Sequence, residues 1–335
     1  MNAMILTTLC LLIPAAEDVA PTSSQAELVS VQKIWNAAPH SAFTDLIRFH
    51  NAWYCTFREA EDHVGSDGQI RVITSNDAKT WESVALFEED GIDLRDPKIC
   101  ITPDDRLMVV MGGSVYEGKE LVGRQPRVTF SSDGQNWGPL QRVLSDGHWL
   151  WRVTWHDGTA YGVSYLTTRA GEDDWGLVLV SSADGVNYTE VTKLEIPGRP
   201  NETTLRFTPS GEMIALVRRE ADSKNAWIGT SKAPYTEWTW NETSERLGGP
   251  DFIILPNGAM WAGGRHYLEG GARTMLTKMT LDSLTPVLDL PSGGDTSYPG
   301  FVWHDGLLWM TYYASHEDKT SIYLARIRIN DAVDE

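Results

Sequence analysis

A strand, tight turn and strand unit recurs six times along this chain of 335 residues, and this repeat constrains the fold more than any other feature. Turns rich in Asn, Asp, Ser and Gly separate runs of β-branched and aromatic residues, as in TTLRFTPSGEMIALV and PGFVWHDGLLWMTYY. These residue types favour hairpin turns flanked by strands. The turns are centred at intervals of 53, 53, 53, 47 and 48 residues, on Asn51, Asp104, Asp157, Ser210, Asn257 and Asp305.

Repeats of about 50 residues are long enough for four short antiparallel strands each, which is typical of propeller blades. We therefore predict an all-β fold, a six-bladed β-propeller of four-stranded antiparallel blades that forms one domain over residues 28–330. The segment 28–35 precedes the first unit and has the pattern of a strand. We expect it to become the outer strand of the last blade and to close the ring.

A second motif follows the first three units at residues 75–81, 131–137 and 182–188. Each copy is Ser-x-Asp, then Gly or Ala, any residue, Thr or Asn, and an aromatic residue. An Asp side chain accepts hydrogen bonds from the backbone of its own turn, and the aromatic residue can then pack on the neighbouring layer. The motif predicts that Asp77, Asp133 and Asp184 brace turns and are not catalytic.

The charge of the chain disfavours polyanionic partners. It carries 28 basic and 46 acidic residues, a net charge of −18, which opposes general binding to nucleic acid phosphates. Residues 4–16 are apolar and precede a polar stretch, so we predict a signal peptide over residues 1–20 and export to the periplasm or the cell exterior. No later apolar run is long enough for an integral membrane helix. We expect a monomer.

The cysteines and histidines give no sign of a metal or cofactor site. Cys55 and Cys100 lie in strand-like runs, where a free thiol usually behaves as a small buried hydrophobe. A disulfide between them is the less favoured alternative. No CxxC or His-rich spacing predicts a metal ligand set, and we expect no organic cofactor.

Polar residues concentrate at two places in each unit, the start of the inner strand and the end of the second strand. Antiparallel pairing brings these two places to one face of the ring, so they predict a site at the axis. The inner strands begin with Asp45, Asp96, Arg152, Glu202, Asp251 and Tyr298. The second strands end with Arg58 and Glu59, Gly112 and Gly113, Tyr165, Arg218 and Arg219, Arg265 and His266, and Tyr313 with His316.

These features resemble the sialidase (neuraminidase) superfamily, whose six-bladed propellers carry repeated Asp boxes. The resemblance covers residues 40–327, although the boxes here are one residue shorter than Ser-x-Asp-Gly-Gly-x-Thr-Trp. It implies an exo-acting glycoside hydrolase that cleaves a terminal, anionic sugar from a glycan. It also implies Tyr298 as nucleophile and Glu202 as its base, because a phenol with a pKa near 10 needs an adjacent carboxylate. Asp62 would be the acid/base, with Asp67 as the fallback.

The resemblance further implies three arginines that bind the sugar carboxylate. Arg218 matches the second, with Arg219 as a replacement, and Arg273 matches the third, with Arg265 as an alternate. The first is missing, because the expected Tyr-Arg-Ile-Pro-like step is FTDL here, with Thr44 and Asp45 at the relevant positions. The candidates to replace its charge are Arg58, Arg95 and Arg152. If none does, the substrate is another sugar, and Asp45, Asp96, Glu202 and Asp251 become candidates for an acid/base pair.

Two other functions compete with hydrolysis of a sialic acid. One is a polysaccharide lyase or a hydrolase acting on a uronic or other non-sialic sugar, in which Tyr298 or Tyr313 with His266 or His316 would remove a proton. The other is a non-catalytic propeller that binds glycans, since a fold does not fix a function. In each case the partner is a carbohydrate, and Trp149, Trp151 and Trp175 are candidates to stack on sugar faces.

Overall fold

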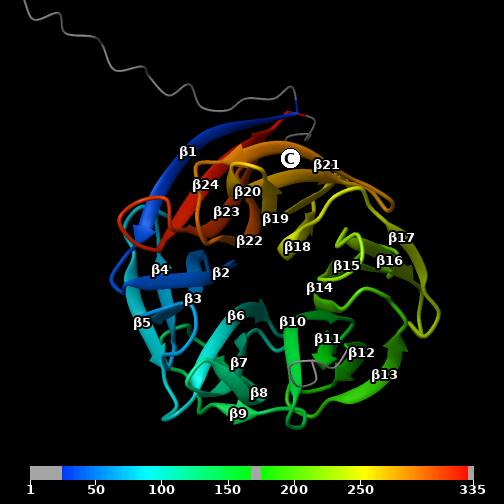
Figure 1. The fold of residues 1–335 in the computed structure, drawn as a ribbon, viewed down its shortest axis with the longest axis horizontal. Helices are drawn as coiled ribbons and strands as arrows, with labels where there is room; N and C mark the ends of the chain where they lie inside the picture. The colour runs from blue at the N-terminus through cyan, green and yellow to red at the C-terminus, as the bar shows by residue number, and fades with distance from the viewer. Residues whose placement is uncertain (1–24, 167–174, 331–335) are drawn as a thin grey trace, which may run out of the picture.

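The computed structural model describes residues 25–166 and 175–330 and shows a six-bladed β-propeller, as the repeats predicted. Six four-stranded antiparallel sheets surround one axis, and their innermost strands face it (Figure 1). The predicted signal peptide, residues 1–20, lies outside the described residues. Residues 25–166 and 175–330 contain no helix that is long and apolar enough to cross a membrane.

Each blade begins at the axis with its first strand. The first three blades, each given from the inner to the outer strand, are β2 (His40–Phe49), β3 (Ala52–Ala60), β4 (Gln69–Ser75) and β5 (Glu82–Phe87); β6 (Asp93–Ile101), β7 (Leu107–Glu117), β8 (Glu120–Ser131) and β9 (Gln141–Arg142); and β10 (His148–His156), β11 (Thr159–Leu166), β12 (Gly176–Ser182) and β13 (Thr189–Leu194). The next two are β14 (Pro200–Phe207), β15 (Met213–Arg219), β16 (Trp227–Ser231) and β17 (Thr239–Glu242); and β18 (Gly248–Ile254), β19 (Met260–Leu268), β20 (Gly271–Met279) and β21 (Leu284–Leu290).

The sixth blade is built from both ends of the described chain. It contains β22 (Thr296–His304), β23 (Leu307–Ala314) and β24 (Ser321–Ile329), and β1 (Ala26–Trp35) pairs antiparallel with β24 as the outer strand. The prediction that residues 28–35 close the ring is therefore confirmed. This pairing fastens the first strand of the described chain to the last blade and so holds the ring closed.

Apolar side chains pack between the blades. Their alternation along each strand buries one set against the preceding blade and the other against the next, which is why the apolar residues form several clusters instead of one. Large aromatic residues such as Trp53, Trp151 and Trp261 are almost fully buried. Cys55 is buried and Cys100 partly buried, and both thiols are free. The less favoured alternative, a disulfide between them, is therefore not formed.

The three motif turns have the hydrogen bonds that their sequence predicts. The Asp77 carboxylate accepts from the backbone N–H of Lys79 and Thr80, both at 2.8 Å. Asp133 and Asp184 accept equivalent backbone hydrogen bonds at 2.7–2.8 Å. The backbone bonds from Thr80 and Lys79 lower the pKa of Asp77 to about 2. The prediction that these residues brace turns is confirmed.

Every inner strand contains one extra residue near its start. In each blade the pairing of the inner strand with the second strand skips one position, which defines a β-bulge. The bulged pairs are Phe43–Thr44, Asp96–Pro97, Trp151–Arg152, Asn201–Glu202, Gly249–Pro250 and Tyr298–Pro299. Bulges redirect side chains. All six blades therefore have a β-bulge that changes the direction of side chains where the inner strand begins.

Candidate active site

A cavity of about 470 Å³ is lined in part by residues of these bulges. Phe43, Asp96, Asn201, Glu202 and Tyr298 line it from four inner strands. Phe43, Asp96 and Tyr298 have positive φ angles of 64°, 49° and 53°, which are unfavourable for residues with a Cβ. Strained backbone of this kind is concentrated at functional sites, so the bulges mark this cavity as the candidate site.

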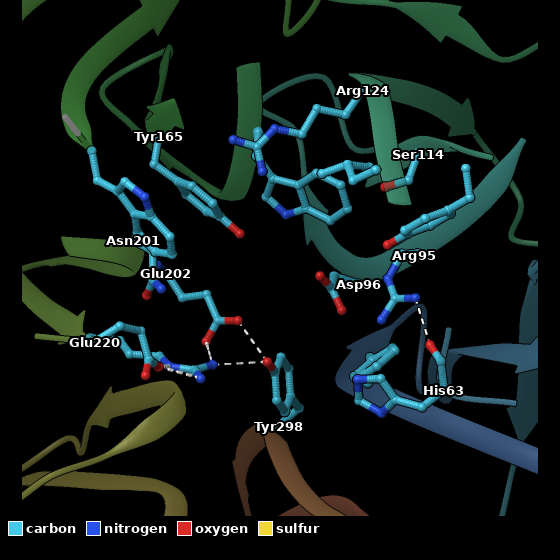
Figure 2. A pocket seen from close by; sticks show the side chains of 16 residues that line it. His63, Arg95, Asp96, Ser114, Arg124, Tyr165, Asn201, Glu202, Glu220 and Tyr298 are labelled. Atoms are coloured by element: carbon cyan, nitrogen blue, oxygen red, sulfur yellow. Dashed lines mark hydrogen bonds and ion pairs between the residues drawn. The ribbon is translucent and has the colours of Figure 1, made fainter. Parts of the chain in front are cut away.

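Tyr298 and Glu202 are joined by a direct hydrogen bond in the wall of the cavity. The Tyr298 hydroxyl donates to Glu202 Oε1 at 2.6 Å, although the two residues are 96 positions apart. Arg218 Nη1 donates to Glu202 Oε2 at 2.7 Å and to the Tyr298 hydroxyl at 3.0 Å (Figure 2). Burial, followed by the Glu202 charge, raises the pKa of Tyr298 well above its ordinary value. The phenol is therefore protonated at neutral pH, and Glu202 is placed to accept its proton.

Gly249 of the fifth blade contacts both members of this pair. Its backbone N–H donates to Glu202 Oε2 at 3.0 Å. A Cβ at this position would lie 2.4 Å from Cδ2 of Tyr298, and the residue has a φ of 61°. Only glycine allows the bulge of the fifth blade to approach the ring this closely while donating to the carboxylate.

Asp96 is the second carboxyl group of the cavity that belongs to an inner-strand bulge. It is 8% exposed, and its Oδ1 is buried without a hydrogen-bond partner among the described residues. Burial raises the pKa of Asp96 above its ordinary value against the opposing charge of Arg95, and Glu202 adds to the increase. A buried carboxyl group with a raised pKa at an accessible cavity wall has the properties of a general acid.

The opposite wall of the cavity is aromatic and carries a cation. Trp149 and Tyr165 lie on the third blade, and Trp175 directly precedes β12 of the same blade. Arg124 on β8 lies 5.3 Å from the Tyr165 ring centroid. Gly112 makes room for Trp149, because a Cβ there would lie 2.2 Å from the indole. Aromatic faces beside hydrogen-bonding groups are the usual lining of a small-molecule pocket.

Other charged residues from the inner strands lie in a buried network instead of in the cavity. Arg152 Nη1 donates to Asp45 Oδ2 at 2.8 Å, and Arg152 Nη2 lies 3.1 Å from Asp251 Oδ2. Arg206 donates to Asp251 at 2.6 Å. Asp45 and Asp251 come directly after their bulges, whereas Asp96 and Tyr298 are the first bulged residues. This difference in position directs the carboxylates of Asp45 and Asp251 into the core.

The buried axial network of Asp45, Arg152, Arg206 and Asp251 is connected to the site through the backbone carbonyls of Thr44 and Tyr298. Lys98 Nζ donates to the carbonyl of Thr44 at 3.1 Å, and the Thr44 hydroxyl donates to the carbonyl of Tyr298 at 2.7 Å. Burial, with the charge of Arg152 adding to it, lowers the pKa of Lys98 to about 8. The cations beside Thr44 and Asp45 are therefore Lys98 and Arg152, and neither lines the cavity.

The remaining predicted residues take other places. Asp62 and Asp67 are exposed and do not line the cavity, whereas His63 does. Arg58 is fully buried and donates to Asp93 at 2.7 Å, and Arg219 is buried and donates to the carbonyl of Pro197 at 2.7 Å.

The arginine cluster that the resemblance implied is not assembled in the cavity. Arg265 donates to Asp295 at 2.9 Å, Arg273 donates to the carbonyl of Ala272 at 3.0 Å, and His316 packs on the ring of Tyr323. None of these three residues lines the cavity. Arg218 does, together with Arg95 and Arg124 from the second blade. Of these two, only Arg95 was among the predicted replacements for the missing arginine.

Several lining residues had no distinctive sequence signal. Ser114, Tyr116, Leu121 and Arg124 come from the hairpin of β7 and β8, which is longer than the hairpins of the other blades. The bulges themselves do have a sequence signal, which is proline. Pro97, Pro250 and Pro299 occupy second bulge positions, and proline within a sheet is confined to edges, strand starts and bulges.

The fold is shared with glycoside hydrolases. No family model matches the sequence, and no curated protein sequence matches it. Solved structures do match. A Dyadobacter fermentans protein of unknown function is 16% identical, with a TM-score of 0.81 over 92% of this chain and 100% of that chain.

Two enzymes are among the similar structures. Trypanosoma rangeli sialidase in complex with the inhibitor DANA is 12% identical, with a TM-score of 0.68 over 92% of this chain and 60% of that chain. The GH93 α-L-arabinofuranosidase of Fusarium graminearum in complex with arabinobiose is 14% identical, with a TM-score of 0.65 over 86% of this chain and 93% of that chain. This chain therefore spans about 60% of the sialidase. At these identities the similarity establishes the propeller fold alone.

Proposed function

We propose that this protein is a glycoside hydrolase that cleaves a terminal, non-sialic sugar from a glycan. The observation that carries the proposal is the hydrogen bond of 2.6 Å between the Tyr298 hydroxyl and Glu202, with Arg218 on both groups, in the wall of a cavity of about 470 Å³. A phenol with a carboxylate base and an adjacent cation is an activated nucleophile.

The proposed reaction has two steps. Tyr298 Oη attacks the anomeric carbon as Glu202 takes its proton, and the bond to the leaving oxygen breaks as Asp96 protonates that oxygen. A water molecule then gives a proton to Asp96 and attacks the anomeric carbon, while the bond to Tyr298 breaks and Glu202 returns the proton to the phenol. Two displacements at one carbon retain its configuration.

The charges around Arg218 argue against a sialic acid substrate. Arg218 is bracketed by Glu202 at 2.7 Å and by Glu220 at 2.5 Å. A sugar carboxylate would have to displace one of these carboxylates to form a bidentate pair, and Thr44 takes the position of the first arginine. The trypanosomal sialidase and the fungal arabinofuranosidase show that this propeller occurs in enzymes named for quite different sugars. The pairing of Arg218 with two carboxylates favours a neutral sugar over a carboxylated one.

A panel of aryl glycosides tests the proposal. We expect aryl release from at least one neutral glycoside, such as an arabinofuranoside, and none from the aryl sialoside. The product from uronate polymers distinguishes the alternatives, because a lyase creates an unsaturated, ultraviolet-absorbing end and a hydrolase does not. Sialoside cleavage would contradict the substrate assignment, and glycan binding without any product would contradict catalysis.

Replacement of Asp96 tests the proton donor. We expect Asp96→Asn to lower kcat/KM about 10²–10⁴-fold on glycosides with poor leaving groups. The loss should be much smaller on activated nitrophenyl glycosides, whose leaving group needs no proton. Because burial raises the pKa of Asp96, wild-type activity should fall on the alkaline side only above the ordinary range of an aspartate. The alkaline fall in activity should be absent from Asp96→Asn. Equal losses on both types of substrate would contradict the role of Asp96 as proton donor.

A further inference from the structure

His40, His63 and Asp295 converge beside the cavity, and of the three only His63 lines it. His40 is the first residue of β2, His63 lies in the loop between β3 and β4, and Asp295 directly precedes β22. His63 Nδ1 lies 2.6 Å and His40 Nε2 lies 3.1 Å from Asp295 Oδ2. One donor atom from each of the three side chains lies within 4.8 Å of the other two. The group joins the first and the last blade across 255 positions of sequence.

Hydrogen bonds from the surroundings hold Asp295 and the backbone of His63 in place. Asp295 Oδ1 accepts from Arg265 Nη2 at 2.9 Å and from the Tyr313 hydroxyl at 2.8 Å, which leaves Oδ2 directed at the two imidazoles. The carbonyl of His63 accepts from Arg95 Nη1 at 2.7 Å, and the preceding carbonyl, of Asp62, accepts from Arg58 at 2.9 Å. Hydrogen bonds to the far side of a ligand are the usual support of a metal site.

We propose that His40 Nε2, His63 Nδ1 and Asp295 Oδ2 bind a divalent transition metal ion, with Zn²⁺ as the best match. Two imidazoles and one carboxylate are a common zinc ligand set that leaves a fourth position open. Tetrahedral zinc with bonds of about 2.0–2.1 Å separates its ligand atoms by about 3.3–3.5 Å. The pair of His40 and Asp295 is near that spacing, and His63, whose side chain is 46% exposed, is free to move outward by the required fraction of an ångström.

The position of the site gives the ion two consequences. It would link β2 to the segment before β22, next to the seam where β1 closes the ring, and so oppose opening of the propeller. It would also fix His63, which lines the cavity across Tyr298 from Glu202 (Figure 2). The ring of Phe43 lies between them, 5.3 Å from the His63 ring and 5.0 Å from the Tyr298 ring. The site is therefore separate from the pair of Tyr298 and Glu202.

Titration of the full chain with ZnCl₂, after treatment with a chelator, tests this site independently of any activity. We expect one Zn²⁺ per chain by isothermal titration calorimetry and a higher melting temperature in its presence. His63→Ala and Asp295→Asn should each weaken binding at least about 100-fold, more than the loss of an outer-shell partner causes, and should abolish the thermal shift.

His50 supplies the matched control. Its Nε2 lies 2.8 Å from Asp105 Oδ2, so it forms the same histidine–carboxylate pair at the surface. His50→Ala should bind Zn²⁺ as tightly as the unchanged chain. Failure of the unchanged chain to bind Zn²⁺, or equal binding by the His63→Ala and His50→Ala variants, would overturn the proposal. The three groups would then be a hydrogen-bonded link between blades.

Discussion

Tyr298→Phe should lower kcat by at least about 10³-fold on every glycoside that the protein cleaves, because it removes the atom that forms the covalent intermediate. The variant loses only the hydroxyl, and the ring still packs on Phe43 and Trp151 at centroid distances of 5.0 Å and 5.5 Å. The contact of 2.7 Å between Arg218 and Glu202 does not involve the phenol. Folding should therefore be retained, as judged by the melting temperature and the circular dichroism spectrum.

Tyr312→Phe is the control for this experiment. Tyr312 is fully buried, and its hydroxyl donates to the carbonyl of Pro291 at 2.8 Å, away from the cavity. Its loss should leave kcat unchanged. Mass spectrometry of the protein after rapid quenching should find the sugar on Tyr298. Full activity in Tyr298→Phe together with none in Glu202→Gln would instead make Glu202 the nucleophile, with Asp96 as the other carboxyl group of an ordinary pair.

The fold was predictable because its signals are local. Each hairpin turn and each Ser-x-Asp turn is specified by adjacent residues, and six copies of one unit leave little choice of architecture. The outer position of β1 followed from the same count, since the strand had no other blade to join. Glu202 and Tyr298 were singled out because both stand at the starts of inner strands, and Arg218 because it ends a second strand. The roles predicted for them came from the resemblance to the sialidase superfamily.

The distribution of the charged residues was not predictable in this way. Asp45 and Asp96 both stand at inner-strand starts, but the bulge places one in the core and the other in the cavity. A shift of one or two positions decides the direction of a side chain, and the positive φ of Phe43 has no marker in residue type. The position of His63 beside Asp295 depends on long-range contacts that no repeat encodes.

The buried axial network should be the feature whose loss destabilises the protein most. Arg152 is 5% exposed and lies between the carboxylates of Asp45 and Asp251, each 1% exposed. Arg152→Met leaves both carboxylates without this shared cation. Removing one partner of a buried ion pair lowers the free energy of unfolding by about 3–5 kcal/mol, which denaturant titration measures. Because Thr44 connects this network to the carbonyl of Tyr298, activity should fall as well.

Arg142→Met is the matched control, since Arg142 is 60% exposed and pairs with Glu89 at 2.7 Å. An exposed pair of this kind contributes about 0–1 kcal/mol, so similar losses in the two variants would contradict the role of the network.

The deficit of Arg152→Met should also depend on pH. Burial raises the pKa of Asp251, and Arg152 opposes that increase, so the variant raises the pKa of Asp251 further above its unfolded value. A group whose pKa is higher in the folded state binds more protons there than in the unfolded state, and stability then falls as pH rises through the interval between the two values. The deficit should be largest at neutral pH and shrink as the pH approaches about 4, the ordinary pKa of an aspartate. A deficit that stays constant from pH 7 to that point would show that lost packing, and not unpaired charge, destabilises the variant.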